Sequence, residues 1–315
     1  MGDMTEMMFR EMTPTDLPAV TAMLQRAMEF DEFPGEALVA EKTTAAADFD
    51  PALSAVLHDD DGDGAPPRPI AMAMAALGQG EGHAAKGYVR LMAVSRAHRS
   101  RGIGNALLAE MERRLAERGA TTVAIFDCPH NYLVPGVDFR YTHAHGLLLK
   151  RGYAMHRENH DMLAPLHPDA WPDLDAEAAA QTSAGLHIRR AAPADKPAID
   201  AFLDAHWPAW RFEVHAALAN HPVSLHLAFR GDAVVAFSGY QGNNRTLPWF
   251  GPMGTCPTLR GKGIGAILLK LCLRDLACQG WPEAIIPWVG PVGFYAKHCA
   301  ARLDRCFWAY RKMLA

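Results

Sequence analysis

The chain has 315 residues, half of them hydrophobic, and its formal net charge at pH 7 is −4. At roughly 100–200 residues per domain, this length predicts two domains, each with enough apolar residues for a core of its own. The small negative charge gives no sign of the basic stripe with which nucleic-acid-binding proteins contact phosphates, so we expect no nucleic-acid partner.

The composition gives no sign of export or of membrane insertion. Residues 1–12 carry several charges and lack the apolar segment of a secretion signal, and the apolar run 69–77 is too short to cross a bilayer. The six cysteines form no Cys-x-x-Cys pair, so we expect reduced thiols in the cytoplasm. No cysteine or carboxylate completes a zinc pattern around the histidines, so we expect no metal site.

Two segments of the chain are repeated. Residues 9–20, FREMTPTDLPAV, resemble residues 188–199, IRRAAPADKPAI, and each predicts a short strand, a turn with proline and an aspartate-capped helix. Residues 99–108, RSRGIGNALL, match residues 260–269, RGKGIGAILL. The chain therefore contains two copies of one design. We expect domains at 1–163 and 187–315, with the Ala-, Asp- and Pro-rich segment 164–186 as the linker.

Each copy predicts the same order of elements around the repeated glycine motif. Strands are expected at 70–77, 87–94, 121–126, 233–240, 249–255 and 284–289. Apolar residues four apart predict amphipathic helices at 103–118 and 264–278, directly after the motif. A last helix and a closing strand would finish each copy. The predicted fold class is therefore α/β, with a mixed sheet in each of two tandem domains.

The repeated Arg-x-x-Gly-x-Gly motif, at 99–104 and 260–265, has the composition of a diphosphate-binding loop. Glycines let the backbone approach a ligand closely, and the free N–H groups of a first helical turn bind anions. Two basic residues in each motif add positive charge. A dinucleotide fingerprint needs a third glycine where this chain has Leu107 and Leu268, and neither copy has the Gly-Lys-Ser/Thr of a P-loop.

The motif and the strand before it resemble the acyl-CoA-binding loop of the GNAT acetyltransferases. The resemblance covers most of residues 9–163 and 188–315, and the chain is identified as a tandem, two-domain member of that superfamily. In the family, the exposed edge of the preceding strand pairs with the pantetheine arm of CoA. The resemblance therefore implies acetyl-CoA as co-substrate, bound by Met92, Ala93, Val94, Arg99, Ser100, Arg101, Gly102, Ile103, Gly104, Met253, Gly254, Thr255, Arg260, Gly261, Lys262, Gly263, Ile264 and Gly265.

The last helix of the family often carries a tyrosine that protonates the departing CoA thiolate. Tyr295 of the second copy matches that position, and a phenol with a pKa of about 10 is a reasonable acid for a thiolate. The first copy has Leu148 at the equivalent place, preceded by an unusual segment at 129–142. The resemblance therefore implies catalysis in the second copy, with packing of the Tyr295 ring on the sheet as the alternative.

The acceptor amine must lose a proton before it attacks the thioester, to a base or through water. The sequence does not single out this base, and the candidates are Asp127, His130, His206 and Glu213. Candidate contacts to the acceptor are Asp138, Tyr141 and Trp210. Capping or packing explains such residues equally well.

The function that the resemblance implies is direct transfer of an acetyl group from acetyl-CoA to a primary amine, in a cytoplasmic monomer or homodimer. Small amines, amino acids, aminoglycosides and peptide N-termini are all possible acceptors. Two alternatives stay open. One or both halves could bind CoA only to stabilise or regulate the pair, or the enzyme could use a longer acyl-CoA.

Overall fold

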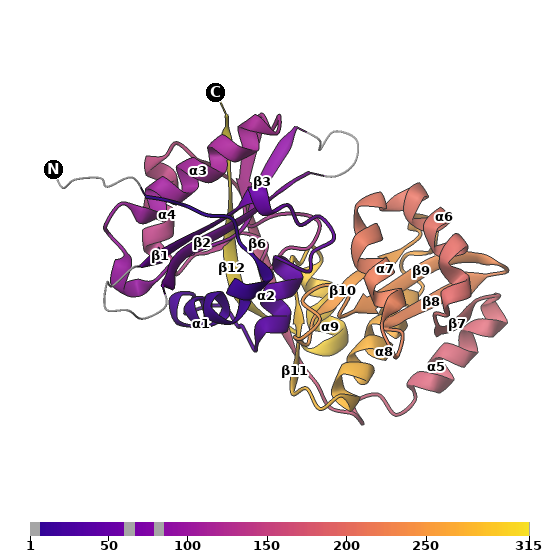
Figure 1. Ribbon diagram of the computed structural model, residues 1–315. Coiled ribbons are helices and arrows are strands. Elements are labelled where there is room, and N and C mark those ends of the chain that lie inside the picture. Colours follow the sequence, from indigo (N-terminus) through magenta and orange to yellow (C-terminus); the bar gives the residue numbers. More distant parts are fainter. Residues whose placement is uncertain (1–6, 60–66, 79–84, 315) are drawn as a thin grey trace. The chain divides into compact units, whose positions relative to one another are not determined.

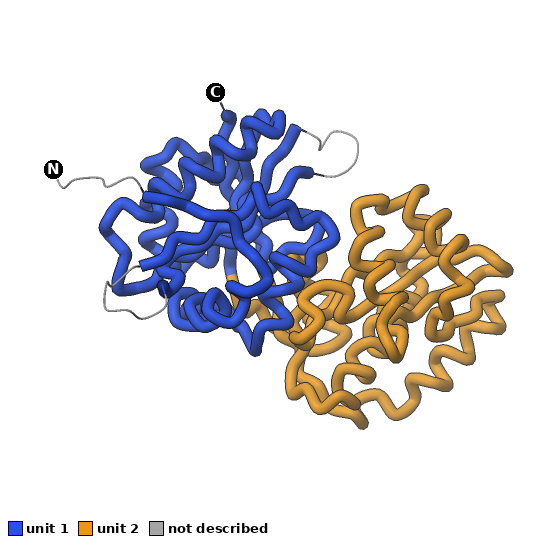
Figure 2. The backbone as a smooth tube through the Cα atoms, in the orientation of Figure 1, with its two compact units in different colours: residues 1–159, 306–315 blue, residues 160–305 orange. Residues whose placement is uncertain are grey.

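The computed structural model describes residues 7–59, 67–78 and 85–314, and the chain divides into two compact units (Figure 1 and Figure 2). Unit 1 comprises residues 1–159 and 306–315, and unit 2 comprises residues 160–305. The predicted α/β class is confirmed, since helices cover strands that pair both parallel and antiparallel. No helix of the described ranges is long and apolar enough to cross a membrane.

Unit 1 is built on a mixed sheet with the strand order β1-β2-β3-β4-β12. Its strands are β1 (Ser54–Asp59), β2 (Arg68–Leu77), β3 (Lys86–Val94), β4 (Thr122–Ile125) and the end of β12 (Arg302–Met313), with the short β5 (Val137–Asp138) paired to β12. Its longer helices are α1 (Leu17–Ala27), α2 (Glu36–Lys42), α3 (Ile103–Glu117) and α4 (Thr142–Lys150). Figure 1 shows α1 and α2 on one side of this sheet and α3 and α4 on the other.

Unit 2 holds an antiparallel sheet with the strand order β10-β9-β8-β7. These strands are β7 (His187–Arg190), β8 (Leu225–Arg230), β9 (Ala233–Tyr240) and β10 (Phe250–Thr255). A further strand, β11 (Glu283–Ile286), pairs with the end of β6 (Ala154–Pro165). The helices are α5 (Leu174–Ala180), α6 (Lys196–His206), α7 (Arg211–Ala219), α8 (Ile264–Cys278) and α9 (Val292–Cys299).

The closing strands of the two copies are exchanged. The last strand of the chain, β12, pairs with β4 of unit 1, with Tyr310 opposite Ile125. The last strand of the first copy, β6, pairs with β11 of unit 2, with Met162 opposite Ile286. The sequence predicts a second domain that runs to residue 315, whereas residues 306–315 lie in unit 1. Side-chain alternation predicts a strand but not the edge that it joins, and two similar copies offer two similar edges.

The segment 164–186, which the sequence predicts as a linker, is a folded part of unit 2. Its helix α5 packs against α8, and the side chain of Leu174 is fully buried there. Lys270 of α8 donates to Glu177 at 3.2 Å, close to a second ion pair between the same two helices. The alanine-rich composition of this segment favours a helix as much as it favours a linker.

The repeat is visible in the turn before the first helix of each unit. In unit 1, the carboxylate of Asp16 binds the guanidinium of Arg10 and accepts the backbone N–H of the residue three positions earlier. In unit 2, Asp195 binds Arg189 at 2.7 Å and accepts the equivalent N–H. Both aspartates stand at the predicted N-cap position of their helices, but neither makes a side-chain hydrogen bond into its helix, and their carboxylates hold the turn before it instead.

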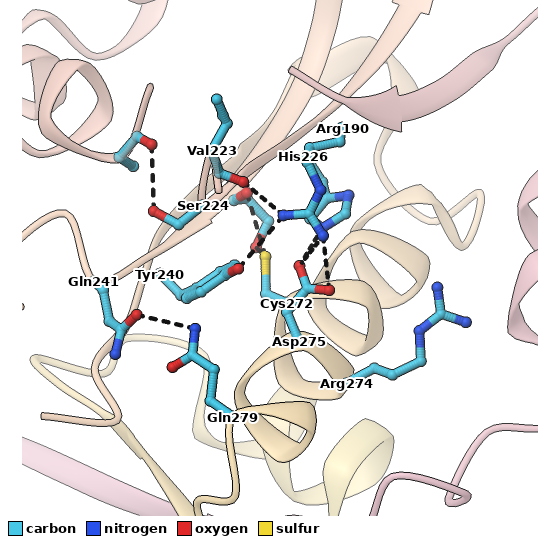
Figure 3. Close-up of polar contacts among 12 residues, drawn as sticks. Arg190, Val223, Ser224, His226, Tyr240, Gln241, Cys272, Arg274, Asp275 and Gln279 are labelled. Atoms are coloured by element: carbon cyan, nitrogen blue, oxygen red, sulfur yellow. Dashed lines mark hydrogen bonds and ion pairs between the residues drawn. The ribbon is translucent and has the colours of Figure 1, made fainter. Parts of the chain in front are cut away.

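A charged cluster lies inside unit 2, between α8 and the sheet (Figure 3). The carboxylate of Asp275 accepts two hydrogen bonds from Arg190 at 2.8 Å and lies 2.7 Å from Nε2 of His226. Arg190 also donates to the carbonyl of Val223 at 2.5 Å. The Nδ1 atom of His226 is buried and has no hydrogen-bond partner in the part of the chain that the structure describes. The cluster fixes β7 and β8 to the end of α8.

Candidate active site

In unit 1, β3 and β4 start as parallel neighbours and then separate. Their pairing ends where the N–H of Phe126 donates to the carbonyl of Val89 at 2.9 Å. Beyond this point β3 stays paired with β2 on its other side, up to Val94 opposite Ala71. A bulge at Arg90 interrupts the register where the strands part. Residues 91–94 therefore present a backbone edge to the gap between the two strands.

A cavity of about 470 Å³ lies beside this edge. Its walls come from β3, the loop and first turn of α3, the residues that end α1, and α4. Of the nine CoA-binding positions predicted in the first copy, those that line it are Met92, Ala93, Val94, Arg99, Ser100, Gly102 and Gly104. Of the other two, Ile103 is buried beneath the loop and Arg101 is exposed. Ile125, Phe126 and Leu148 add apolar surface where the strands converge.

The two glycine loops have the same backbone geometry. Gly102 precedes α3 with a φ of 84°, and Gly263 precedes α8 with a φ of 80°, a region that favours glycine. The arginine three residues earlier, Arg99 or Arg260, donates from Nε to the carbonyl at the end of the preceding strand, at 3.2 Å and 3.4 Å. Each loop thus places a cationic side chain beside the N-terminus of a 15-residue helix, where an anion is stabilised.

The start of α4 brings polar side chains to the cavity. Arg140 and Tyr141 line it, and both are fixed by neighbours. The buried carboxylate of Asp138 accepts from Nε and Nη2 of Arg140 at 2.8 and 2.7 Å, and the guanidinium lies over the ring of Phe30 at 4.3 Å. The hydroxyl of Tyr141 donates to Asp31 at 2.7 Å. Of the predicted acceptor contacts, Tyr141 therefore reaches the cavity directly, whereas Asp138 positions Arg140.

Tyr295 lies in the hydrophobic core of unit 2. The residue is 7% exposed, and its ring meets Phe250 and Phe294 edge to face, with centroids 6.0 and 5.2 Å apart. Burial raises the pKa of its phenol above the usual value, with Cys299 adding to the effect, so the group is a weaker acid than free tyrosine. These surroundings favour the packing alternative. The role of Tyr295 in protonating the CoA thiolate stays a prediction.

Trp210, the third predicted acceptor contact, belongs to an aromatic cluster that follows α6. Its ring stacks on Trp207, with centroids 5.2 Å apart and planes 25° from parallel, and it meets Phe237 edge to face. Both indoles are half-buried. The packing explains the position of Trp210, and its contact with an acceptor stays a prediction.

A buried polar cluster in unit 1 joins the two chain segments where β3 and β4 separate. Arg90, from the bulge in β3, is fully buried and binds the carboxylate of Asp48. His130, which follows β4, lies 3.1 Å from the same carboxylate through Nε2, and the Sγ of Cys128 lies 3.6 Å from that nitrogen. The sequence places His130 among the possible bases but does not indicate Asp48 or Arg90. The sequence does hold one signal for this cluster, since a charged residue, Arg90, lies inside the otherwise apolar strand 86–94.

Comparison with known proteins identifies the family. Residues 18–133 match the model of the acetyltransferase (GNAT) family. The first copy therefore contains a GNAT acetyltransferase domain. This match covers most of the first copy, from α1 to the segment that contains His130. No curated protein sequence matches the chain.

Solved structures extend the GNAT fold to both copies. A GNAT N-acetyltransferase from Sphaerobacter thermophilus has 19% sequence identity and a TM-score of 0.70, over 98% of this chain and 95% of that chain. A tandem GNAT protein from the clavulanic acid biosynthesis pathway has 15% identity and a TM-score of 0.63, over 98% of each chain. A glucosamine N-acetyltransferase region of a fungal multi-domain β-N-acetylglucosaminidase has 17% identity and a TM-score of 0.77. The similarity to the fungal protein covers 97% of this chain but 38% of that longer one.

Proposed function

We propose that this GNAT protein transfers an acetyl group from acetyl-CoA to a primary amine, and that the cavity of unit 1 binds the acetyl-CoA. The observation that carries the proposal is the meeting of three features at one cavity: the strand edge 91–94, the loop of Gly102 and the N-terminus of α3. The amides of a pantetheine arm can form hydrogen bonds with the strand edge. The pyrophosphate suits the helix N-terminus with Arg99 beside it.

The chemistry needs little from the protein beyond placement of the two reactants. The amine nitrogen attacks the thioester carbonyl carbon, the carbon–sulfur bond breaks, and the electron pair leaves on the sulfur of CoA. The amine loses one proton and the thiolate gains one. Holding both reactants in line removes the entropic cost of their encounter. Ile125 and Leu148 supply apolar walls at the converging end of the gap, which favours exclusion of water from the thioester.

Unit 2 repeats the loop at 260–265 and the strand at 253–255, so we propose a second CoA contact there. Catalysis in unit 2 through Tyr295 is the second candidate, since a phenol stands where the family places its acid. Binding without catalysis in unit 2 is equally compatible with its loop. The position of the cavity favours unit 1 as the site of the reaction.

Calorimetry and thiol release test the proposal together. Acetyl-CoA and a longer acyl-CoA are titrated into the full chain, and release of free CoA thiol is then followed with glucosamine, free amino acids, an aminoglycoside and short peptides. We expect acetyl-CoA binding, and thiol release that depends on one acceptor class. A full chain that binds no acetyl-CoA, or that releases no thiol with any amine of the panel, would contradict the proposed function. Faster transfer from the longer acyl-CoA would show that this compound, and not acetyl-CoA, is the donor.

A further inference from the structure

We propose that His130 takes the proton from the acceptor amine, with Asp48 and Arg90 as its positioning residues. The inference rests on the proposed function, because it assigns the amine side of the same reaction to a cluster that lies beyond the residues lining the cavity. It is carried by the place of this cluster at the converging end of the strands, by the strained backbone on both sides of His130, and by the way in which its ring is held.

The separation of β3 and β4 sets the position of His130. Phe126 makes the last backbone pair with Val89 and lines the cavity, and His130 follows it by four residues. On the other strand, Arg90 follows Val89 directly, and its side chain meets that of Asp48. A ligand arm that enters from the loop of α3 along residues 91–94 reaches its end here. The thioester of bound acetyl-CoA would therefore lie near Phe126, next to the cluster.

On both sides of His130, the backbone adopts a conformation that residues other than glycine rarely take. Phe126 has a φ of 67° and Asn131 a φ of 60°. The surrounding structure maintains this, since the side-chain oxygen of Asn131 accepts from Nζ of Lys42 at 2.7 Å and its amide donates to the carbonyl of Glu41 at 2.6 Å. Such strain is concentrated at functional sites, where the fold fixes a reactive side chain.

The ring of His130 is held at one nitrogen and open at the other. Nε2 faces the carboxylate of Asp48, and in the described residues Nδ1 has no hydrogen-bond partner. The side chain keeps 11% of its surface exposed. A carboxylate at one imidazole nitrogen fixes the tautomer and the orientation of the ring. The opposite nitrogen is then free to exchange a proton with a substrate.

Asp48 also needs support, because an isolated carboxylate in this position would be costly. Arg90 supplies it from β3, and its Nε is a buried donor with no partner in the described part of the chain. Burial opposes ionisation of Asp48, but its hydrogen bonds with His130 and Arg90 prevail and hold the pKa of this carboxyl well below its usual range. Asp48 therefore remains an anion through the whole range in which an amine reacts.

The groups around His130 are Asp48 from the segment after α2, Tyr88 from β3 and Cys128 from its own segment, with Arg90 behind Asp48. Burial lowers the pKa of the imidazole, but the hydrogen bonds with Asp48 and Cys128 outweigh burial and raise the pKa of His130 to about 9. The neutral ring, which is the base, therefore increases as the pH rises toward 9. This pKa is close to that of an alkylammonium ion, which is about 10, so a proton can pass from the amine to the imidazole at little cost.

The step balances without a further reactant. The amine nitrogen bonds to the carbonyl carbon of acetyl-CoA while one N–H proton passes to Nδ1 of His130. The carbon–sulfur bond breaks, and its electron pair leaves on the sulfur. The imidazolium then returns its proton to solvent, from which the thiolate regains one. Asp48 stays ionised throughout and stabilises the imidazolium, so it acts as a positioning residue.

The test compares pH profiles of thiol release from acetyl-CoA, with the most active amine of the acceptor panel, in the full chain and in three variants. His130→Gln should lower kcat by about 10²-fold or more, since general base catalysis typically contributes 10²–10⁴. Asp48→Asn should lower kcat less than His130→Gln does and should move the midpoint of the alkaline rise to lower pH, because it removes the anion that raises the pKa of His130. His215→Gln, which breaks a His–Asp pair in unit 2 at 2.5 Å, is the matched control and should keep the profile.

Calorimetric affinity for acetyl-CoA shows that each variant is folded. An unchanged midpoint in Asp48→Asn would overturn the inference, since the alkaline rise in rate would then reflect deprotonation of the acceptor amine itself. Full activity of His130→Gln would overturn it as well. Both results would leave the proposed function standing. A wild-type chain that releases no thiol with any amine would instead overturn the proposed function and this inference together.

Discussion

The indole of Trp207 lies directly over Gly254: a Cβ added to Gly254 would be 2.6 Å from Cζ3 of that ring. Gly254 occupies the place in β10 that Ala93 occupies in β3, and Trp207 follows α6 as Met28 follows α1. Met28 and Ala93 both line the cavity of unit 1. Unit 2 therefore has a large aromatic ring at the place where unit 1 has the slimmer side chain of Met28 beside the cavity.

This relationship predicts that Trp207 limits CoA binding in unit 2. Trp207→Met introduces the residue of unit 1 and frees space while it keeps the site apolar. We expect acetyl-CoA affinity to rise about tenfold, which corresponds to about 1.4 kcal/mol. The measurement is calorimetry in a Gly102→Val background, so that unit 2 dominates the signal. Trp210→Met is the control, and equal affinities in the two variants would show that the indole over Gly254 has no special effect.

The glycine loops give a second prediction. Gly102→Val places a β-branched side chain at a φ of 84°, next to the N-terminus that is proposed to bind pyrophosphate. Acetyl-CoA affinity in unit 1 should fall by about tenfold or more, and Gly263→Val should do the same in unit 2. Gly119→Val has the same φ at the other end of α3 and should leave affinity unchanged once the variant is folded. Wild-type affinity in the double variant Gly102→Val and Gly263→Val would rule out both loops as CoA sites.

A third prediction separates the two units as the place of catalysis. If Tyr295 protonates the leaving thiolate, Tyr295→Phe should lower kcat by about 10²–10⁴-fold with little change in CoA affinity. Since the ring is buried among Phe250 and Phe294, we expect the variant to keep its rate instead. The measurement is the pH dependence of thiol release. A large loss of kcat across the pH range would move the chemistry to unit 2.

The sequence predicts the glycine loops and most of the regular elements because their signals are local. Turn glycines, strand-forming runs and a four-residue apolar spacing fix the segments around Gly102 and Gly263, and the helix at 264–278 has the predicted bounds. The partner of β12 could not be predicted in this way, because strand pairing depends on which edge is open in space. The sequence also does not bring Asp48, Arg90 and His130 together. Their contact depends on a bulge and a loop conformation that no local pattern encodes.

The last prediction concerns the charged cluster of Figure 3 and the stability of unit 2. Burial opposes ionisation of Asp275, but His226 and Arg190 prevail and hold the pKa of its carboxyl below the usual value near 3.9. A carboxyl with a lowered pKa stabilises the fold above its unfolded-state pKa, and this stabilisation is lost as the pH falls through the lower folded-state value.

Asp275→Asn should therefore lower the free energy of unfolding by about 3 kcal/mol at pH 7, near the lower end for a broken buried pair, because the side chain of Arg190 is 36% exposed. Urea denaturation measures the loss, and the difference from wild type should shrink as the pH falls below 4. Asp200→Asn breaks a more exposed pair with His215 and should cost about 1 kcal/mol or less. Equal losses in the two variants, or a loss for Asp275→Asn that is constant between pH 7 and pH 3, would show that the charge of Asp275 does not stabilise unit 2.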